Sequence, residues 1–131
     1  GSHASTFGGN PVSCVAALQT IGLLEEELIE NARIVGDYLQ TQLRKLAEKH
    51  DIIGDVRGLG LMVGAELVKD RESRESIPAV RDAVVQACFE RGLLLLGCGK
   101  STLRFCPPLV VDEEDVEIAM GILDEVLENL K

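Results

Sequence analysis

The first half of the chain contains one long amphipathic pattern. From Leu28 to Leu46 apolar residues recur every three or four positions, and Glu, Arg, Lys and Gln fill most of the positions between them. The apolar residues are Leu28, Ala32, Val35, Leu39, Leu43 and Leu46. Residues at this spacing share one face of an α-helix, so the pattern predicts a long helix that lies with one side on a hydrophobic core. Its charged side is expected to face solvent.

Shorter apolar runs elsewhere in the chain are typical of β-strands. The predicted strands are Ile52–Val56, Leu59–Leu67, Leu93–Leu96 and Thr102–Phe105. These runs are rich in aliphatic and β-branched residues and are bounded by turn-forming or charged residues. We expect Arg57-Gly58 to separate the first two strands and the second strand to be central in its sheet. Leu93–Leu96 is expected to be a buried strand, and Gly97–Ser101 to turn the chain before the last one.

Capping residues mark the starts of three further helices. The start signals are Asn10-Pro11, Ser76 with Pro78, and Asp112. Side chains of this kind accept hydrogen bonds from first-turn amides, and proline suits the first turn because no amide partner is needed there. The first of these helices is expected to end near Gly22. The resulting order of elements predicts an α+β fold, in which helices cover one face of a small, mostly antiparallel sheet.

The glycines of Gly58-Leu59-Gly60-Leu61-Met62-Val63-Gly64 suggest a dinucleotide-binding fingerprint at first sight. That fingerprint requires a strand before it and a helix that opens on its last glycine. Here the glycines lie within a strand pattern, where they usually mark a bulge or close backbone packing. The sequence therefore argues against a nucleotide-binding domain.

Composition limits the partners that the chain can bind. A formal net charge of −9 argues against nucleic acid and anionic membranes, which attract clustered Lys and Arg. No apolar stretch approaches the roughly 20 residues that span a bilayer, and no signal-peptide pattern opens the chain. We therefore predict a soluble, cytoplasmic protein. Gly1-Ser2-His3 can be read either as a tag remnant or as part of the natural sequence.

The cysteines do not indicate a metal site. Cys14, Cys88, Cys98 and Cys106 form no C-x-x-C pair, and neither histidine is spaced to complete a ligand set. Free buried thiols are expected. Cys98 and Cys106 could approach one another across a hairpin, although a structural disulfide is uncommon in a cytosolic protein.

The turn Ser5–Pro11 is a candidate anion site. Ser5 and Thr6 supply two hydroxyl groups, the glycines at 8 and 9 leave the backbone open, and the helix that follows directs its positive end toward the turn. A phosphate or carboxylate would suit these groups. An ordinary capped turn that binds nothing explains the same residues.

Arg104 is a second candidate. It lies between Leu103 and Phe105 in a predicted strand, and Cys106-Pro107-Pro108 gives this strand a rigid exit. A guanidinium group in apolar surroundings favours a carboxylate partner and can donate two parallel hydrogen bonds to it. An internal salt bridge, or an outward-facing strand position, is the simpler explanation.

Three stretches of the chain resemble the class III, or omega, aminotransferases in the same order. They are Ser5–Pro11 with the small-residue run Val12–Ala17, Val56–Met62 and Leu103–Leu109. This family of pyridoxal-phosphate enzymes includes the 4-aminobutyrate, ornithine and acetylornithine aminotransferases. The resemblance covers essentially the whole chain but only the last third or so of such an enzyme.

The resemblance implies a fold and a role for each candidate residue. Residues 25–131 would form the C-terminal small domain of a fold-type I pyridoxal-phosphate enzyme, and residues 1–24 would belong to its large domain and dimer interface. Thr6, with Ser5 beside it, would bind the cofactor phosphate held by the other subunit. Arg104 would bind the α-carboxylate of the amino donor or of the keto-acid acceptor.

The resemblance also implies what the chain lacks. The Schiff-base lysine of the family lies upstream of the threonine turn, and Lys45, Lys49, Lys69, Lys100 and Lys131 have no matching context. We therefore expect a parent enzyme, a homo-oligomer, that moves an amino group from an ω-amino acid or amine to a 2-oxo acid. The fragment alone is expected to be inactive. A standalone carboxylate-binding or oligomerisation domain with the same fold is the alternative.

Overall fold

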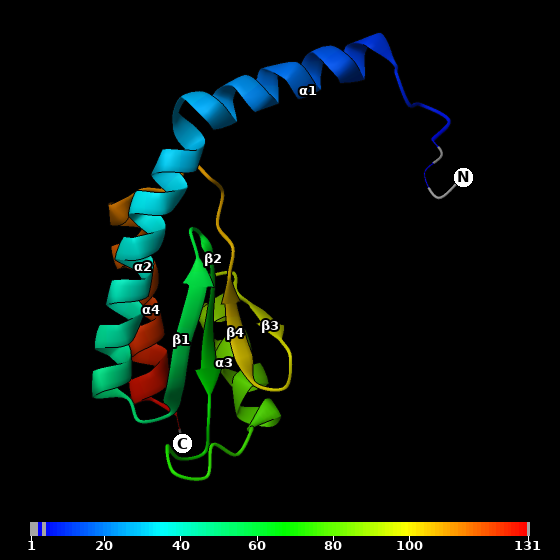
Figure 1. Cartoon of the computed structure of the whole chain (residues 1–131). Helices are drawn as coiled ribbons and strands as arrows, with labels where there is room; N and C mark the ends of the chain where they lie inside the picture. Colours follow the sequence, from blue (N-terminus) through cyan, green and yellow to red (C-terminus); the bar gives the residue numbers. More distant parts are fainter. Residues whose placement is uncertain (1–2, 4, 131) are drawn as a thin grey trace.

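A computed structural model describes residue 3 and residues 5–130 of the chain (Figure 1). The elements in order are α1 (Pro11–Leu23), the π-helical turn η1 (Leu24–Leu28), α2 (Ile29–Lys49), β1 (Ile53–Leu59), β2 (Met62–Leu67), α3 (Pro78–Glu90), β3 (Leu96–Cys98), β4 (Thr102–Phe105) and α4 (Glu113–Glu128). The predicted order of helices and strands is confirmed, as is the α+β class. Gly1 and Ser2 of the suggested tag remnant lie outside the described residues.

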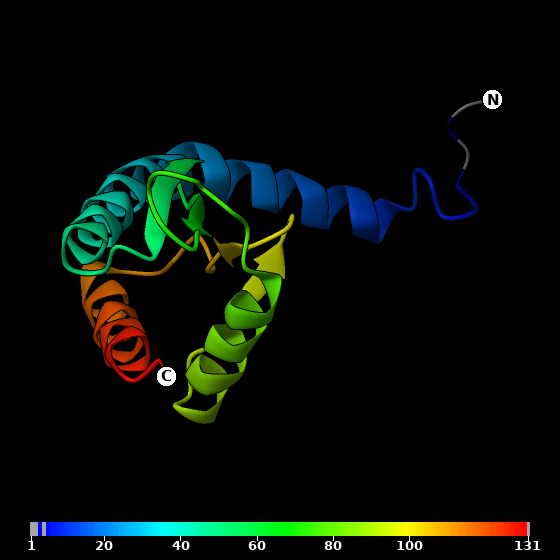
Figure 2. The same ribbon diagram turned by 90° about the horizontal axis from the view of Figure 1, so that it is seen from below.

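The strands form one antiparallel sheet in the order β1-β2-β4-β3, with β2 central as expected. Figure 2 shows α2, α3 and α4 gathered on one side of this sheet. Successive strand residues point to opposite faces, so one face is covered by the helices and the other is open. On the open face lie Asp55, Arg57, Gly64, Glu66 and Arg104.

Apolar side chains from the covered face and the three helices form the core. The predicted stripe of α2 is confirmed, because Val35, Leu39 and Leu43 are all buried. The helix α4, which contacts α2, contributes Leu123, which is fully buried, and Met120, which is 7% exposed. Each such side chain contributes roughly 1.5–3 kcal/mol through the area it removes from water.

A glycine at the centre of α2 allows the hairpin between β1 and β2 to approach the helix closely. A Cβ atom at Gly36 would collide with the backbone carbonyl of Gly60, which lies in that hairpin. Glycine costs about 1 kcal/mol in a helix interior, so close packing of this kind explains its presence. The contact fixes the position of the hairpin over α2.

The hairpin turn was predicted at the wrong place. Arg57 and Gly58 lie within β1, and the turn consists of Gly60 and Leu61, because Leu59 pairs with Met62. Gly60 has a φ of +52°, a conformation that glycine adopts without strain at the first position of a two-residue turn. No helix follows the glycines, which agrees with the argument against a dinucleotide fingerprint.

The α-helix α1 ends at Leu23, next to the expected end at Gly22, but the helical backbone does not stop there. Gly22 is helical, and Leu24 retains helical angles of −62° and −46°, so α1 continues through η1 into α2 without a break. A glycine ends a helix when it takes the left-handed conformation, and Gly22 does not. Pro11 to Lys49 is therefore one continuous helical segment.

The run Leu93–Leu96 is not a buried strand. Only Leu96 belongs to β3, and Leu94 and Leu96 are 79% and 59% exposed. Leu94 precedes the edge strand, and Leu96 is opposite Arg104 in the sheet, so its side chain lies on the open face, away from the helices. The turn that follows begins at Gly99 rather than at residue 97.

Of two predicted helix starts, the one at Asp112 is confirmed and the one at Ser76 is wrong. Asp112 caps α4 as expected, since its Oδ1 accepts a hydrogen bond of 2.9 Å from the amide of Asp115. Ser76 does not cap α3. Ile77 occupies the cap position, and Ser76 instead forms an isolated bridge with Val68.

Charged side chains connect the end of α2 to α4. His50 Nε2 lies 2.6 Å from Asp124 Oδ1, and Lys49 Nζ lies 2.8 Å from Asp124 Oδ2 and 2.5 Å from Glu128 Oε1. The hydrogen bonds from His50 and Lys49 lower the pKa of Asp124 below its ordinary value. The charged form of Asp124 is therefore favoured in the folded chain.

Replacement of Leu123 by Ala is expected to lower the free energy of unfolding by about 2–5 kcal/mol, because it leaves a cavity in the core. Ile118→Ala, on the same helix but 58% exposed, is the matched control and should cost well under half as much. Chemical denaturation measures both. Equal losses in the two variants would contradict the assignment of this core.

Asp124 should also make stability depend on pH. Its folded-state pKa lies below the unfolded value of 3.8, so its contribution is complete above that value and is lost as the pH falls toward the folded-state pKa. Asp124→Asn should therefore flatten the decline of unfolding free energy below about pH 4. Glu25→Gln, an exposed acid on η1, is the control. An unchanged decline in Asp124→Asn would contradict the linkage.

Candidate functional site

Arg104 lies near the middle of the open face. In the sheet register it is opposite Gly64 on β2 and Leu96 on β3, and Gly64 is in turn opposite Arg57 on β1. Its strand neighbours Leu103 and Phe105 point into the core and are buried. The strand thus anchors Arg104 on both sides while its own side chain is exposed.

The guanidinium group of Arg104 has no carboxylate partner among the described residues. The acids of the open face, Asp55 and Glu66, pair with Arg57 instead, at 2.6 and 2.8 Å from its Nη1. These two carboxylates raise the pKa of Arg57 above its ordinary value. The internal salt bridge offered as a simpler explanation of Arg104 is therefore absent from this part of the chain, whereas the outward-facing strand position offered beside it is present. The donors of Arg104 are free for an external carboxylate.

A cleft of about 400 Å³ lies beside Arg104. It is bounded by the loop Leu93–Leu96, by the segment Arg104–Pro108 and by the first turns of α4, where Asp115 and Val116 line it. Apart from Arg104 and Asp115 its walls are mainly apolar. A mostly apolar cleft with few polar groups is the usual form of a small-molecule site.

The turn before α1 is capped by its own residues. Asn10 Oδ1 accepts hydrogen bonds from the amides of Val12 and Ser13, at 3.0 and 3.3 Å, which confirms the predicted cap. Ser5 Oγ accepts a hydrogen bond from the amide of Phe7 at 3.2 Å. Two helix amides that could bind an anion are therefore already occupied. Thr6 is exposed, and its hydroxyl makes no hydrogen bond within the described residues.

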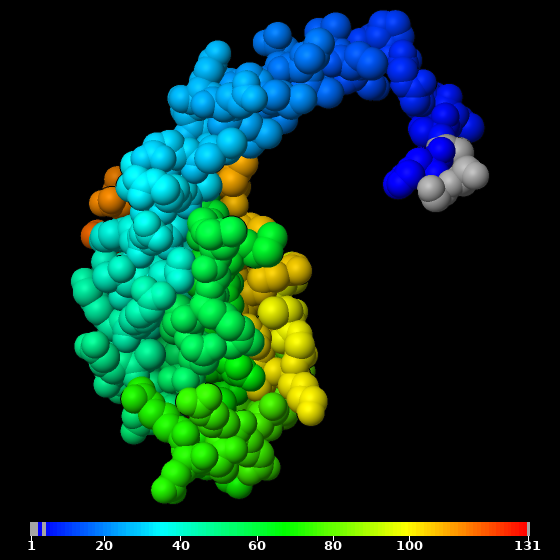
Figure 3. All heavy atoms as spheres, in the orientation of Figure 1, coloured from blue at the N-terminus to red at the C-terminus, as the bar shows by residue number. Residues whose placement is uncertain are grey.

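The two candidate positions are far apart in the single chain. Figure 1 shows the turn that contains Thr6 at the far end of α1, away from the sheet that carries Arg104. No residue of α1 is buried, and Figure 3 shows the helix projecting from the body. Its exposed apolar side chains include Val12, Val15, Leu18 and Ile21. A complete site that used both positions would need further protein around α1.

No helix in the described part of the chain is both long enough and apolar enough to cross a membrane.

Lys49 and Lys69 are poorly suited to act as nucleophiles. Asp124 and Glu128 raise the pKa of Lys49, and Glu75, 2.9 Å away, raises that of Lys69. A Schiff-base lysine requires a neutral amine and hence a lowered pKa. Lys100 lies in the exposed turn between β3 and β4, and Lys131 lies outside the described residues.

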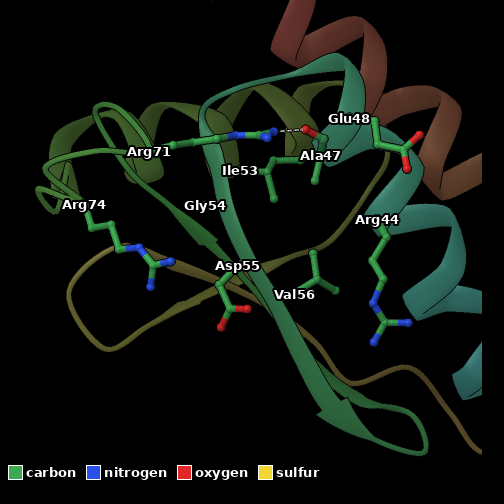
Figure 4. A pocket seen from close by; sticks show the side chains of 9 residues that line it. All are labelled: Arg44, Ala47, Glu48, Ile53, Gly54, Asp55, Val56, Arg71 and Arg74. Atoms are coloured by element: carbon green, nitrogen blue, oxygen red, sulfur yellow. Dashed lines mark hydrogen bonds between the residues drawn. The ribbon is translucent and has the colours of Figure 1, made fainter.

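A depression of about 330 Å³ at the free edge of β1 contains three arginines but is not an anion site (Figure 4). Figure 4 shows Arg44 and Arg74 on opposite sides of β1. Arg71 is already bonded to the backbone oxygen of Ala47. The three guanidinium groups therefore do not converge on one point.

The cysteines take no part in the candidate site as a pair. All four are free, and the suggested approach of Cys98 to Cys106 across the hairpin is wrong. Cys98 is opposite Thr102, so Cys106 lies four residues further along β4 and its exit. Burial raises the pKa of the Cys88 thiol to about 11, which keeps it protonated and unreactive.

Comparison with known proteins adds to this geometry. The family model "Aminotransferase class-III" matches residues 1–127. An acetylornithine aminotransferase of Methanocaldococcus jannaschii is 38% identical over 133 residues, which cover 100% of this chain and 31% of that protein. A 5-aminovalerate aminotransferase of Pseudomonas aeruginosa is 36% identical over 133 residues, which cover 99% of this chain and 31% of that protein.

A solved structure agrees over nearly the whole chain. It is a pyridoxal-phosphate-bound amine transaminase from an uncultivated Pseudomonas species, with a TM-score of 0.89 and 30% identity. The match covers 98% of this chain and 30% of that one. The chain thus spans less than a third of the length of each of these proteins.

Arg104→Met is expected to change the free energy of unfolding by less than about 0.5 kcal/mol, because no ion pair or hydrogen bond among the described residues is lost. Phe105→Ala, one residue away but only 5% exposed, should cost about 3–5 kcal/mol. Denaturant titration compares the two. A large loss in Arg104→Met would indicate a structural role and count against a binding role.

Proposed function

The chain belongs to the class III aminotransferase family, and from this we propose that it forms the C-terminal part of an enzyme that transfers an amino group from an ω-amino acid or amine to a 2-oxo acid. The observation that carries the proposal is the guanidinium group of Arg104 on the open face, which has no carboxylate partner in residues 3 and 5–130 and lies near an apolar cleft. A carboxylate is common to amino acids and 2-oxo acids, so one arginine can serve both halves of the reaction.

In the proposed enzyme Arg104 orients the substrate. Two parallel hydrogen bonds to a carboxylate fix both its position and the rotation of the molecule attached to it. The buried neighbours Leu103 and Phe105 hold the strand in place, so the arginine needs little rearrangement on binding. The apolar walls of the cleft would exclude water from the aliphatic part of the substrate.

Thr6 and Ser5 are proposed to bind the phosphate of the cofactor. Class III aminotransferases use pyridoxal phosphate, which supplies an electron sink for chemistry at the amino-bearing carbon. The free hydroxyl of Thr6 suits a phosphate oxygen, whereas Ser5 Oγ is already an acceptor and could still donate its hydrogen. This turn lies far from the sheet, which favours binding of a phosphate that is held by a neighbouring subunit, as the resemblance implies.

These residues fit only part of the cofactor. The chain offers a phosphate ligand and a carboxylate ligand, but Lys49 and Lys69 have raised pKa values and carboxylate partners. No lysine context matches the Schiff-base lysine of the family. We therefore propose that this stretch is inactive without the rest of the enzyme, which would supply the lysine.

The same reasoning supports the proposed division of the chain. Residues 1–24 would pack against the large domain and the second subunit of a homodimer, which would cover the exposed apolar residues of α1. Residues 25–131 would form the small domain. The boundary between the two falls within η1, where the helix changes its hydrogen-bonding pattern.

The amino donor is the least constrained part of the proposal. The two relatives described above are named for acetylornithine and 5-aminovalerate. Proteins that resemble this chain to a similar degree are thus named for different donors. More narrowly, we propose that the donor resembles 4-aminobutyrate. We also propose that the enzyme is cytoplasmic. Arg104 would recognise the carboxylate that such compounds share.

A standalone carboxylate-binding or oligomerisation domain is the second candidate. The sheet and its helices have a complete core without further protein, which favours this reading. A self-sufficient module should be monomeric or form a defined oligomer. A stretch that lacks its large domain should instead self-associate through the apolar side chains of α1. Light scattering across a concentration series distinguishes the two.

A chimaera tests the proposed activity. In it this chain replaces the matching 31% of the M. jannaschii relative, and the product is supplied with pyridoxal phosphate, an amino donor and 2-oxoglutarate. The chimaera should transfer amino groups, and Arg104→Met should raise the KM for 2-oxoglutarate by roughly 10–100-fold, the effect of a lost charge-assisted hydrogen bond. The isolated chain should not turn over.

The isolated chain provides the control. After incubation with pyridoxal phosphate and reduction with borohydride, its lysines should be labelled weakly and without preference. Saturable labelling of one lysine would contradict the proposed inactivity. A folded chimaera that retains the cofactor but transfers no amino group would contradict the proposed parent activity.

A further inference from the structure

Two arginines have matching positions on the open face, and only one of them is paired. Gly64 on β2 is opposite Arg57 on β1 and opposite Arg104 on β4. Glu66, two residues further along β2, is opposite Asp55 on one side and Thr102 on the other. Arg57 and Arg104 therefore each lie two residues from the position directly opposite Glu66, one on either side of β2. Gly64, which lies between the two arginines, has no side chain to separate them.

The diagonal contact is within reach of an arginine. On the β1 side it is formed, with 2.8 Å between Arg57 Nη1 and Glu66 Oε2. Diagonal neighbours in antiparallel strands are near enough for long side chains to meet. The same step on the β4 side would join Glu66 to Arg104, but no such contact is present. Glu66 thus has an arginine at a diagonal position on each neighbouring strand, and it pairs with the one on β1.

The choice of Arg57 has a physical cause. Asp55, two residues away on the same strand and face, lies 2.6 Å from the same Nη1 atom and holds Arg57 beside Glu66. β4 has no acidic residue that could hold Arg104 in the same way. Arg57 therefore satisfies both carboxylates of the open face and leaves Arg104 free.

Stability does not explain this arrangement. The side chains of Asp55, Arg57 and Glu66 are 49%, 56% and 35% exposed. Ion pairs between exposed side chains contribute little to folding, because solvent screens them and long side chains lose entropy. The pairs do, however, determine which cation neutralises Glu66.

We propose that Arg57 is a positioning residue that holds Glu66 away from Arg104, so that the guanidinium group of Arg104 remains available to a substrate carboxylate. This inference rests on the proposed carboxylate-binding role of Arg104. Without Arg57, Glu66 loses its cation, and Arg104 is the remaining cation at the same offset. An internal carboxylate would then compete with the substrate.

Nitrogen-15 NMR of the purified chain tests the inference, with the Arg104 Nε–Hε peak assigned by its loss in Arg104→Lys. In the absence of added carboxylate, Arg57→Met should shift this peak as Glu66 pairs with Arg104. Arg57→Met combined with Glu66→Gln should restore its wild-type position. If Arg57→Met folds poorly, Arg57→Gln, which keeps a polar side chain, replaces it. The same shift of the Arg104 peak is expected in Arg57→Gln.

An acetate titration measures the consequence for binding. Arg57→Met should weaken acetate binding at Arg104 about two- to fivefold, the range of one exposed ion pair. The double variant should return it to the wild-type value. Arg33→Met is the matched control, because it also breaks contacts with two acids, Glu30 and Asp37, but on α2. It should change neither the Arg104 peak nor acetate binding.

The outcomes separate this inference from the proposed function. If the Arg104 peak is the same in Arg57→Met and in wild type, or if Glu66→Gln does not reverse a shift, the inference is overturned. If acetate fails to move the Arg104 peak of the wild-type chain, the carboxylate role of Arg104 fails. The comparison without acetate still reports on Arg57 and Glu66 in that case.

Discussion

Burial of one sheet face beneath α2, α3 and α4 is the constraint on which the other features of this molecule depend. Alternation along each strand sends Val63, Ala65 and Leu103 into the core and leaves the residues between them on the opposite side. Charged side chains therefore collect on a face that no helix covers. Arg104 acquires a rigid backbone from the buried residues on either side of it, and an exposed guanidinium group at the same time.

Local sequence patterns predicted the features that depend on near neighbours. The stripe of α2, the cap at Asp112 and the strand Thr102–Phe105 follow from spacing and residue type. Strand alternation also accounts for the outward direction of Arg104, which the sequence offered only as one alternative to a binding role. The connection between Arg57 and Glu66 could not be predicted in this way, because it depends on strand register. That register depends on a turn at Gly60 and Leu61, which was expected at Arg57-Gly58.

Apolar composition was a poor guide to burial where the chain supplies nothing to cover it. Leu94 and Leu96 form part of an aliphatic run, yet they lie at the edge strand and remain exposed. The same holds for Val12 and Leu18 in α1. Burial is decided by the neighbours that the fold brings to a residue, and for these positions the described residues contain none. The roles proposed for Thr6 and Arg104 likewise rest on family resemblance and not on local pattern.

The continuous helix from Pro11 to Lys49 has a mechanical consequence. Its inner half is fixed to the sheet through Val35, Leu39 and Leu43, whereas its outer half is a free rod of about 20 Å that ends near Thr6. A rod held at one end acts as a lever arm. A tilt of about 10° at η1 displaces the far end of α1 by about 3.5 Å. Small rotations at η1 are thus magnified at the turn that precedes α1.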